Sequence, residues 1–259
     1  MSNLNILWDD YQIYKGVKIY PFLMKDYDIF EDLISILLFN KNNIGDVEII
    51  KMSYLKFLVF LSSQLINDNG DVVYKNILIK LQELFKYVLK DQESIIEINE
   101  KGKLFLHIKT ENEDIFLSEN DFDKLKKIIL IQNAIPIFNN KLHPDLQKEL
   151  EENMKFIANK QNNQDGTIED LIVSYKCEMK FDSYKPIKEM TIYQFRKELA
   201  RLDIIKDYQI YKQAECSGMV SFSKPIPHWL SHKSNEPDYS NLLMNKKDFD
   251  TKMNQFSKE

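Results

Sequence analysis

The first part of the chain alternates between extended and helical patterns of apolar residues. Residues 26–40 repeat apolar positions every three to four residues, and acids crowd the first turn, where a helix dipole favours them. The apolar positions of this predicted helix are Ile29, Leu33, Ile36 and Leu37. The segment before it, 17–24, is rich in β-branched and aromatic residues and contains Pro21, which favours an edge strand.

Two longer apolar segments follow and predict a packed pair of antiparallel helices. The first covers residues 47–66 and is apolar enough to be nearly all buried. The second covers Val72 to Leu89 and follows the helix-breaking sequence "NDNGD". Their apolar faces consist of Ile50, Tyr54, Phe57, Leu58 and Leu61 on the first helix and Ile77, Leu81, Leu84, Phe85 and Val88 on the second.

The pattern then changes to strict alternation between residues 94 and 117. Two polar turns, "NEKGK" and "TENED", interrupt it, so we predict a three-stranded antiparallel meander. His107 lies in the middle strand between Leu106 and Ile108. Because alternate residues of a strand point to opposite faces, His107 is expected on the face of Phe105 and Lys109, as an exposed structural histidine.

A domain boundary is predicted after the next helix. That helix is capped by Ser118 or Asn120 and carries Phe122, Leu125, Ile128, Ile129 and Leu130. Pro136 and Pro144 bracket an Asn-rich segment beyond it. We therefore expect an α+β fold, mainly α, with two domains: 1–140, with the helical pair and the β-meander, and 141–259, helical with an extended C-terminal arm.

Three helices are predicted in the second part of the chain. "PDLQKELEENMKFIANKQ" is charged with a thin apolar stripe, and the next helix starts at Thr167 and is expected to bury Ile168, Leu171, Ile172 and Tyr175. The last and longest begins with Thr191 and Gln194, a capping-box pair, and ends at Gly218.

Composition and charge favour a folded protein that does not bind nucleic acid. Lys and Arg number 35 against 40 Asp and Glu, a formal charge of -5, and no basic block occurs. Arg196, Lys197, Arg201 and Lys206 on the longest predicted helix are interleaved with acids. A nucleic-acid-binding regulator using helices 167–217 stays open as an alternative.

No catalytic or cofactor motif is present, so we expect a protein that is not an enzyme and holds no cofactor. Phosphate-binding, nucleophile-elbow and zinc-protease signatures do not occur. The two cysteines, Cys177 and Cys216, lie on separate predicted helices, and a reducing compartment suits them as partly buried small residues. Without a signal-like or bilayer-length apolar run, we expect a cytoplasmic protein that does not enter a membrane.

The segment "KPIPHWLSHKSNEPDY" is the main candidate site. His228 and His232 are four apart and would share one face of a helix, but zinc requires three or four ligands. A structural or contact role, a pH-sensitive contact and a metal site are the alternatives, and we assign no metal ligand. The aromatic and apolar anchors for a partner are Trp229, Leu230 and Tyr239, with Arg196 and Arg201 as basic contacts. The alternative for this segment is a C-terminal arm that packs Trp229 on its own helical domain.

Several segments of the chain resemble tail assembly chaperone-like proteins of long-tailed bacteriophages and prophages of Gram-positive bacteria. In the C-terminal part they are "TIEDLIVSYKCEM", "MTIYQFRKELARLDIIKDYQIYKQAECSGM", "IPHWLSH" and "NLLMNKKDFDTKM". In the N-terminal part they are "GVKIYPFLMKDYDIF" and "IIKMSYLKFLVFL".

The resemblance implies a non-enzymatic assembly factor in the host cytoplasm. Such a factor would bind the phage tape measure protein, prevent its apolar helices from aggregating and help to recruit the tail tube protein, with self-association as a further contact. A related interpretation is a structural or morphogenetic protein of the virion. Apolar grooves ringed by charge would suit a helical client without any hydrolytic site.

Overall fold

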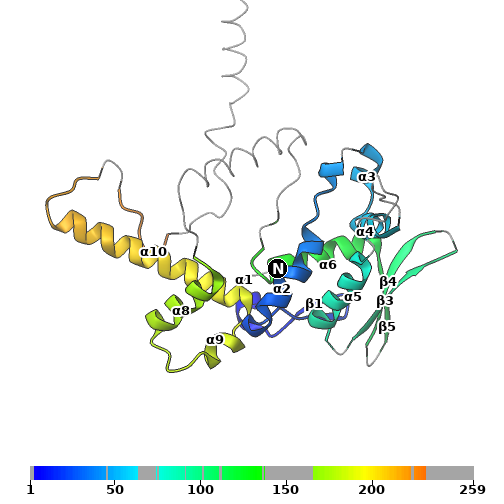
Figure 1. Ribbon diagram of the computed structural model, residues 1–259, viewed down its shortest axis with the longest axis horizontal. Helices are drawn as coiled ribbons and strands as arrows, with labels where there is room; N and C mark the ends of the chain where they lie inside the picture. Colours follow the sequence, from blue (N-terminus) through cyan, green and yellow to red (C-terminus); the bar gives the residue numbers. More distant parts are fainter. Residues whose placement is uncertain are drawn as a thin grey trace, which may run out of the picture. The chain divides into compact units, whose positions relative to one another are not determined.

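The computed structural model describes residues 3–44, 46–63, 74, 76–90, 92–100, 102–110, 113–135, 137, 166–222 and 225–231. The packing of the chain divides it into two compact units, Met1–Leu202 and Asp203–Glu259. Helices and two small antiparallel sheets make up the first unit, and the second contains the end of a long helix (Figure 1). The predicted class, α+β and mainly α, is confirmed.

The first unit opens with a short helix and a tight β-hairpin. These elements are α1 (Asn3–Trp8), β1 (Gln12–Tyr14) and β2 (Val17–Ile19). The turn residues Lys15 and Gly16 have φ values of 49° and 84°, the left-handed conformation that two-residue hairpin turns require. The strand predicted at 17–24 is thus confirmed in a shorter form. The sequence does not predict β1, because three residues are too few to show alternation.

The helices of the first half are shorter than the apolar pattern predicts. They are α2 (Tyr27–Ile34), α3 (Val47–Lys51), α4 (Tyr54–Ser63) and α5 (Ile77–Val88), with 3-10 helices η1 (Met24–Asp26), η2 (Ser35–Leu38) and η3 (Lys41–Ile44). The helix predicted at 47–66 is divided because Ser53 caps α4: its hydroxyl accepts a hydrogen bond from the Lys56 amide at 3.3 Å. The Asp123 carboxylate also accepts a hydrogen bond from the Tyr54 amide, at 3.1 Å. The predicted packing of α4 against α5 is confirmed.

The predicted meander forms the second sheet. Its strands are β3 (Glu93–Ile98), β4 (Leu104–Lys109) and β5 (Asp114–Ser118), antiparallel in the order β3-β4-β5. The register aligns Ile95, His107 and Phe116 across the three strands. Leu106, Ile108 and Leu117 are fully buried on the opposite, inner face.

His107 lies on the predicted face, but the expectation that it is exposed is wrong. Only 8% of the residue is accessible, because its ring stacks on Phe116 with centroids 4.3 Å apart. Its Nδ1 lies 2.9 Å from a carboxylate oxygen of Glu97 on the neighbouring strand. Cross-strand neighbours therefore cover this side chain on a face that the alternation alone marks as solvent-facing.

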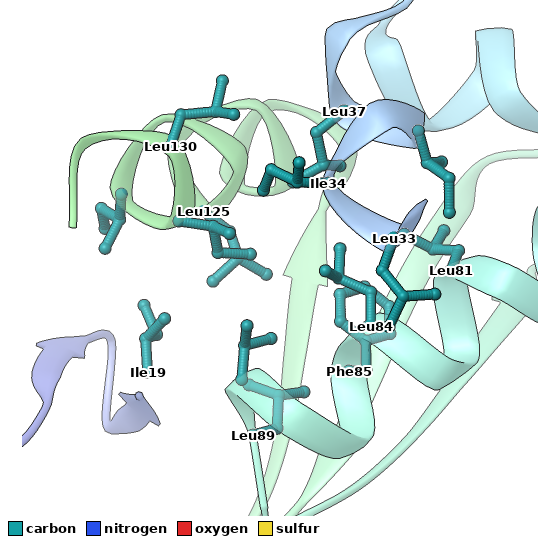
Figure 2. Close-up of a cluster of buried hydrophobic side chains, with 14 of the residues drawn as sticks. Ile19, Leu33, Ile34, Leu37, Leu81, Leu84, Phe85, Leu89, Leu125 and Leu130 are labelled. Carbon is teal, nitrogen blue, oxygen red and sulfur yellow. The ribbon is translucent and has the colours of Figure 1, made fainter. Parts of the chain in front are cut away.

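The core of the first unit fills the space between α2, α5, the last α-helix of the first half and the hairpin β1-β2. Figure 2 shows its aliphatic side chains meeting from these elements, including Ile19, Leu33, Leu84, Leu125 and Leu130. The helix that supplies Leu125 and Leu130 is α6 (Glu119–Ile131). At its end two buried amides hold the backbone after β2: Gln132 Nε2 donates to the Tyr20 carbonyl at 2.9 Å, and Asn133 Oδ1 accepts from the Phe22 amide at 2.9 Å.

Asp121 joins the β1-β2 hairpin to the start of α6. Ser118 caps the helix and exchanges hydrogen bonds with Asp121 in a capping box. The same carboxylate accepts from Tyr14 Oη and Lys15 Nζ, each at 2.8 Å. The hydrogen bond from Lys15 is the main cause that lowers the pKa of Asp121, and those from Ser118 and Tyr14 lower it further. Burial, together with the hydrogen bond to Asp121, raises the pKa of Tyr14 to about 12.

Replacing Asp121 by Asn is expected to reduce the free energy of unfolding by about 2 kcal/mol at neutral pH, as for a lost cap combined with lost charge-assisted bonds. Because the folded pKa lies below the unfolded value, the carboxylate stabilises the fold fully above about pH 5 and loses this contribution as the pH falls further. Urea denaturation at pH 7 and pH 3 would therefore show a difference between wild type and Asp121→Asn that shrinks in acid.

Asp170 offers a matched control for this prediction. It occupies the same position in the capping box of Thr167, but it is exposed, and among the described residues its hydrogen bonds are with Thr167 alone. Asp170→Asn is expected to reduce stability less than Asp121→Asn. Equal losses for the two variants would show that the contacts with Tyr14 and Lys15 contribute nothing.

Three helices follow in the C-terminal part of the described chain: α8 (Ile168–Met179), α9 (Lys185–Glu189) and α10 (Ile192–Cys216). The predicted Thr167 cap is confirmed, and so is the pairing of Thr191 with Gln194, whose backbone and side chains exchange hydrogen bonds of 2.9 and 3.1 Å. Gly218 follows α10 with a φ of 72°, as expected after a helix end. The charged helix predicted before α8 lies outside the described residues.

These helices begin inside the first unit, which the packing extends from Met1 to Leu202. The Ile192 amide donates to the Phe22 carbonyl at 3.0 Å, and the Met24 amide donates to the Met190 carbonyl at 2.9 Å. Leu23 and Thr191 form an antiparallel bridge between these bonds. Residues 190–192 thus extend the N-terminal fold, and the two units separate only after Leu202, within α10.

Two predictions of burial in this region are wrong. The sequence predicts that Leu171 is buried on α8, but it is 37% exposed, whereas Tyr175 is buried as predicted. Cys177 and Cys216 lie on separate helices as expected, yet both are exposed. Leu171 and Cys177 are exposed because only part of α8 faces the core. Cys216 is the last residue of α10, in the second unit.

Candidate partner-binding arm

The candidate site lies at the end of α10 and in the segment that follows it. Residues 203–216 of α10 belong to the second unit, and Gly218 allows the chain to leave the helix axis. We call residues 217–222 and 225–231 the C-terminal arm. Figure 1 shows it returning beside the last turns of α10.

Aromatic rings hold the arm against α10. The rings of Tyr208 and His228 lie 5.6 Å apart, and those of Tyr211 and Phe222 lie 5.7 Å apart. Tyr208 and Tyr211 are three residues apart and therefore neighbours on one helix face. Because the later arm residue meets the earlier helix residue, the arm runs antiparallel to α10.

The predicted extended entry ends in a small turn at His228. Pro225 and Pro227 precede it, and the Ser231 amide donates to the His228 carbonyl at 2.7 Å. His228 Nδ1 also accepts a hydrogen bond from the Leu230 amide at 3.2 Å, which holds the imidazole ring against the turn. The ring of Trp229 lies 5.5 Å from that of His228. His232 and Tyr239, also predicted for this site, lie outside the described residues.

Among the described residues of the second unit, most large apolar side chains are exposed. Those exposed by more than a third are Ile210 (61%), Tyr211 (42%), Met219 (91%), Val220 (46%), Phe222 (37%), Trp229 (39%) and Leu230 (63%). Clusters of exposed apolar residues of this kind mark interaction sites more often than isolated ones do. The arm therefore presents anchors of the residue types that dominate protein interfaces.

The two predicted basic contacts lie in the other unit. Arg196 donates to the Asn133 carbonyl at 3.4 Å and to the Tyr27 hydroxyl at 3.3 Å, and its guanidinium carbon is 5.6 Å from the centre of the Phe30 ring. Arg196 thus holds the start of α10 against other elements of the first unit. Arg201 is half-buried on the same stretch of helix. Of the predicted site residues, the second unit brings together His228, Trp229 and Leu230.

Near the arm, the described residues provide an ion pair on α10, and no candidate metal site was found among them. Lys212 is hydrogen-bonded to Glu215 at 2.7 Å, which raises the pKa of the lysine. Among the described residues, no group of three or more His, Cys, Asp or Glu side chains could hold a metal ion. Within the same residues, no helix has the length and apolar character needed to cross a bilayer.

Residues 159–234 match the family model of the YomV second domain. This is a protein family of the phage and prophage type. No curated protein and no solved structure matches the chain. The YomV-like region contains α8, α9, α10 and the whole described arm, so the match and the candidate site coincide in sequence.

Sequence reasoning found Trp229 and Leu230 but missed the arm residues nearest to α10. Met219, Val220 and Phe222 follow directly after the helix-ending Gly218. Three of the four residues after Gly218 are large and apolar. Because they lie outside the helix, the buried face of a helix does not explain them, and this could have indicated a binding surface. Ile210 and Tyr211 carried no such signal, since a helical pattern does not tell which of its faces is covered.

Proposed function

We propose that the protein is a tail assembly chaperone-like factor of a phage, which binds the tape measure protein in the host cytoplasm and assists tail tube assembly without catalysing a reaction. The concentration of exposed apolar side chains in the YomV-like region is the observation that carries this proposal. The resemblance of six sequence segments to such chaperones supplies the client.

The arm suits a client with apolar helices. Trp229 and Leu230 sit on a turn held by hydrogen bonds to His228, so their positions are fixed before a partner arrives. Preorganised anchors lose less conformational entropy on binding than mobile ones. A helix that presents an apolar stripe would bury these side chains and would itself be kept from self-association.

Coexpression with the tape measure protein of the same phage tests the proposal directly. The tape measure protein is expected to be soluble and to copurify with this chain, and to aggregate when it is expressed alone. If the tape measure protein stayed soluble when expressed alone and did not bind this chain on coexpression, the chaperone role would be contradicted. Mass spectrometry of purified particles separates the alternative of a virion component, because a chaperone is absent from the finished tail.

Trp229→Ala combined with Leu230→Ser is expected to weaken binding of the tape measure protein by at least about tenfold, as for the loss of two interface anchors. Pull-down titration against the coexpressed client would measure this. Ile79→Ser is the control, because Ile79 is 57% exposed on α5 in the first unit, close to the 63% of Leu230. An equal loss in both variants would mean that general surface apolarity, and not the arm, holds the client.

A further inference from the structure

The three-stranded sheet has a free edge at β3. Within the described residues β3 pairs with β4 on one side and with no strand on the other. Alternate backbone amides and carbonyls of such an edge point away from the sheet and can accept another strand. The edge is six residues long, Glu93–Ile98, which is a usual length for a strand.

The side chains of the edge follow a regular pattern on the outer face. Glu93, Ile95 and Glu97 alternate with Ser94 and Ile96, which face the helices. Ile95 is 46% exposed. His107 holds the Glu97 carboxylate on this face at 2.9 Å, so the acid is oriented rather than freely rotating.

A hollow of about 540 Å³ lies beside the first half of β3. Its walls include Lys86 from α5 and Lys90 on one side and Glu93 and Ile95 on the other. The hollow provides room for the inward side chains of an added strand. Those side chains would meet lysines, while the outward ones would meet glutamates.

The charges on the edge disfavour a second copy of this chain as the added strand. If two β3 strands paired antiparallel with Ile95 opposite Ile95, each Glu93 would face a Glu97. Like charges directly opposite each other destabilise a strand pair. Moving the register by two residues, which keeps the faces matched, would place Ile95 opposite Glu97. Glu93 and Glu97 instead favour a strand with one apolar residue opposite Ile95 and a basic residue two positions before it and two positions after it.

We propose that the β3 edge binds an extended segment of another protein with the pattern basic-x-apolar-x-basic. The segment adds antiparallel to β3, with its apolar side chain beside Ile95 and its basic side chains opposite Glu93 and Glu97. Backbone hydrogen bonds supply affinity, and the alternating side chains supply specificity. The β3 edge and the C-terminal arm consist of different residues, and the inference goes beyond the chaperone function proposed above.

A labelled peptide and charge reversal test the proposal in solution. The probe is a fluorescein-labelled peptide with the core lysine-valine-isoleucine-glutamate-lysine, and binding to the full-length protein is measured by fluorescence anisotropy. Glu93→Lys combined with Glu97→Lys is expected to weaken binding about tenfold or more, and a peptide with glutamates at both lysine positions is expected to bind this variant instead.

Two controls separate the edge from general electrostatics. Glu100→Lys combined with Glu113→Lys makes the same charge change outside β3, where both residues are exposed, and should leave binding within about twofold. A peptide with N-methylated valine, the residue opposite Ile96, loses a backbone donor that faces β3 and should bind weakly. The absence of binding by the first peptide, or equal losses in both double variants, would overturn the proposal.

The oligomeric state of single variants gives an independent readout. Glu93→Lys would place Lys opposite Glu97 in an antiparallel pair of β3 strands, twice per dimer, and it leaves the contact of Glu97 with His107 in place. Analytical ultracentrifugation is therefore expected to show stronger self-association for Glu93→Lys than for wild type or for the double lysine variant. Equal self-association of all three would show that the edge does not accept a strand.

Discussion

Phe195→Ala is expected to lower the free energy of unfolding by about 3–5 kcal/mol, the range for a large buried aromatic side chain replaced by alanine. Phe195 is 1% exposed, and its ring lies 5.2 Å from that of Tyr175 in an edge-to-face arrangement. Tyr175 is equally buried and donates a hydrogen bond to Glu198. Removal of the Phe195 ring therefore leaves a cavity between α8 and α10 and loosens the tyrosine that it supports.

Thermal and urea unfolding followed by circular dichroism would measure this loss. Phe222→Ala is the matched control, since it makes the same chemical change at a side chain that is 37% exposed in the arm. We expect the control to change stability by less than about 1 kcal/mol, as surface substitutions usually do. Similar losses for the two variants would show that Phe195 does not belong to the cooperative core.

The sequence predicts those parts of the fold that depend on short-range patterns. Strict alternation locates the meander, and the Thr167 and Thr191 caps locate the starts of α8 and α10, because a cap requires only residues three positions apart. Gly218 is predicted as the helix stop for the same reason. These signals are local, so no knowledge of the partner elements is needed to interpret them.

Features that depend on distant contacts are harder to predict. His107 is buried because Phe116 and Glu97 cover it from two other strands, and the alternation within β4 carries no trace of either neighbour. The break between α3 and α4 depends partly on Asp123, which lies on α6. The apolar run across this break therefore resembles a single helix.

The candidate site was predictable only where its composition is unusual. Trp229 and Leu230 follow two prolines outside any apolar stripe, so they are recognisable as anchors from the sequence. Arg196 looks like an exposed basic contact on a mixed-charge helix face. In the structure it binds Asn133 and Tyr27, which are far away in the sequence. A charge pattern cannot distinguish a surface arginine from one that holds two parts of a unit together.

The same long-range contacts determine where the chain can be divided. A Pro- and Asn-rich segment indicates a linker, but it does not tell whether the helices beyond it pack back on the first part. Here residues 190–192 supply a backbone donor, a backbone acceptor and a bridge to residues 22–24. Ile187 is 2% exposed in the same unit. The first unit therefore requires sequence from both sides of the predicted boundary.

A fragment of residues 1–140 is accordingly expected to be unstable and prone to aggregate, whereas a fragment of residues 1–202 is expected to fold. The shorter fragment lacks Phe195, Ile192 and Tyr175, each of them 1% exposed or less, and it leaves the backbone groups of Phe22 and Met24 without their partners. The free energy lost with this apolar burial and with these backbone hydrogen bonds is expected to exceed the free energy of unfolding that small domains usually have. Size-exclusion chromatography and thermal unfolding of both fragments would measure this difference. If residues 1–140 formed a monomer that unfolds cooperatively at the temperature of the longer fragment, the boundary would lie at 140 and the C-terminal helices would contribute nothing to the first unit.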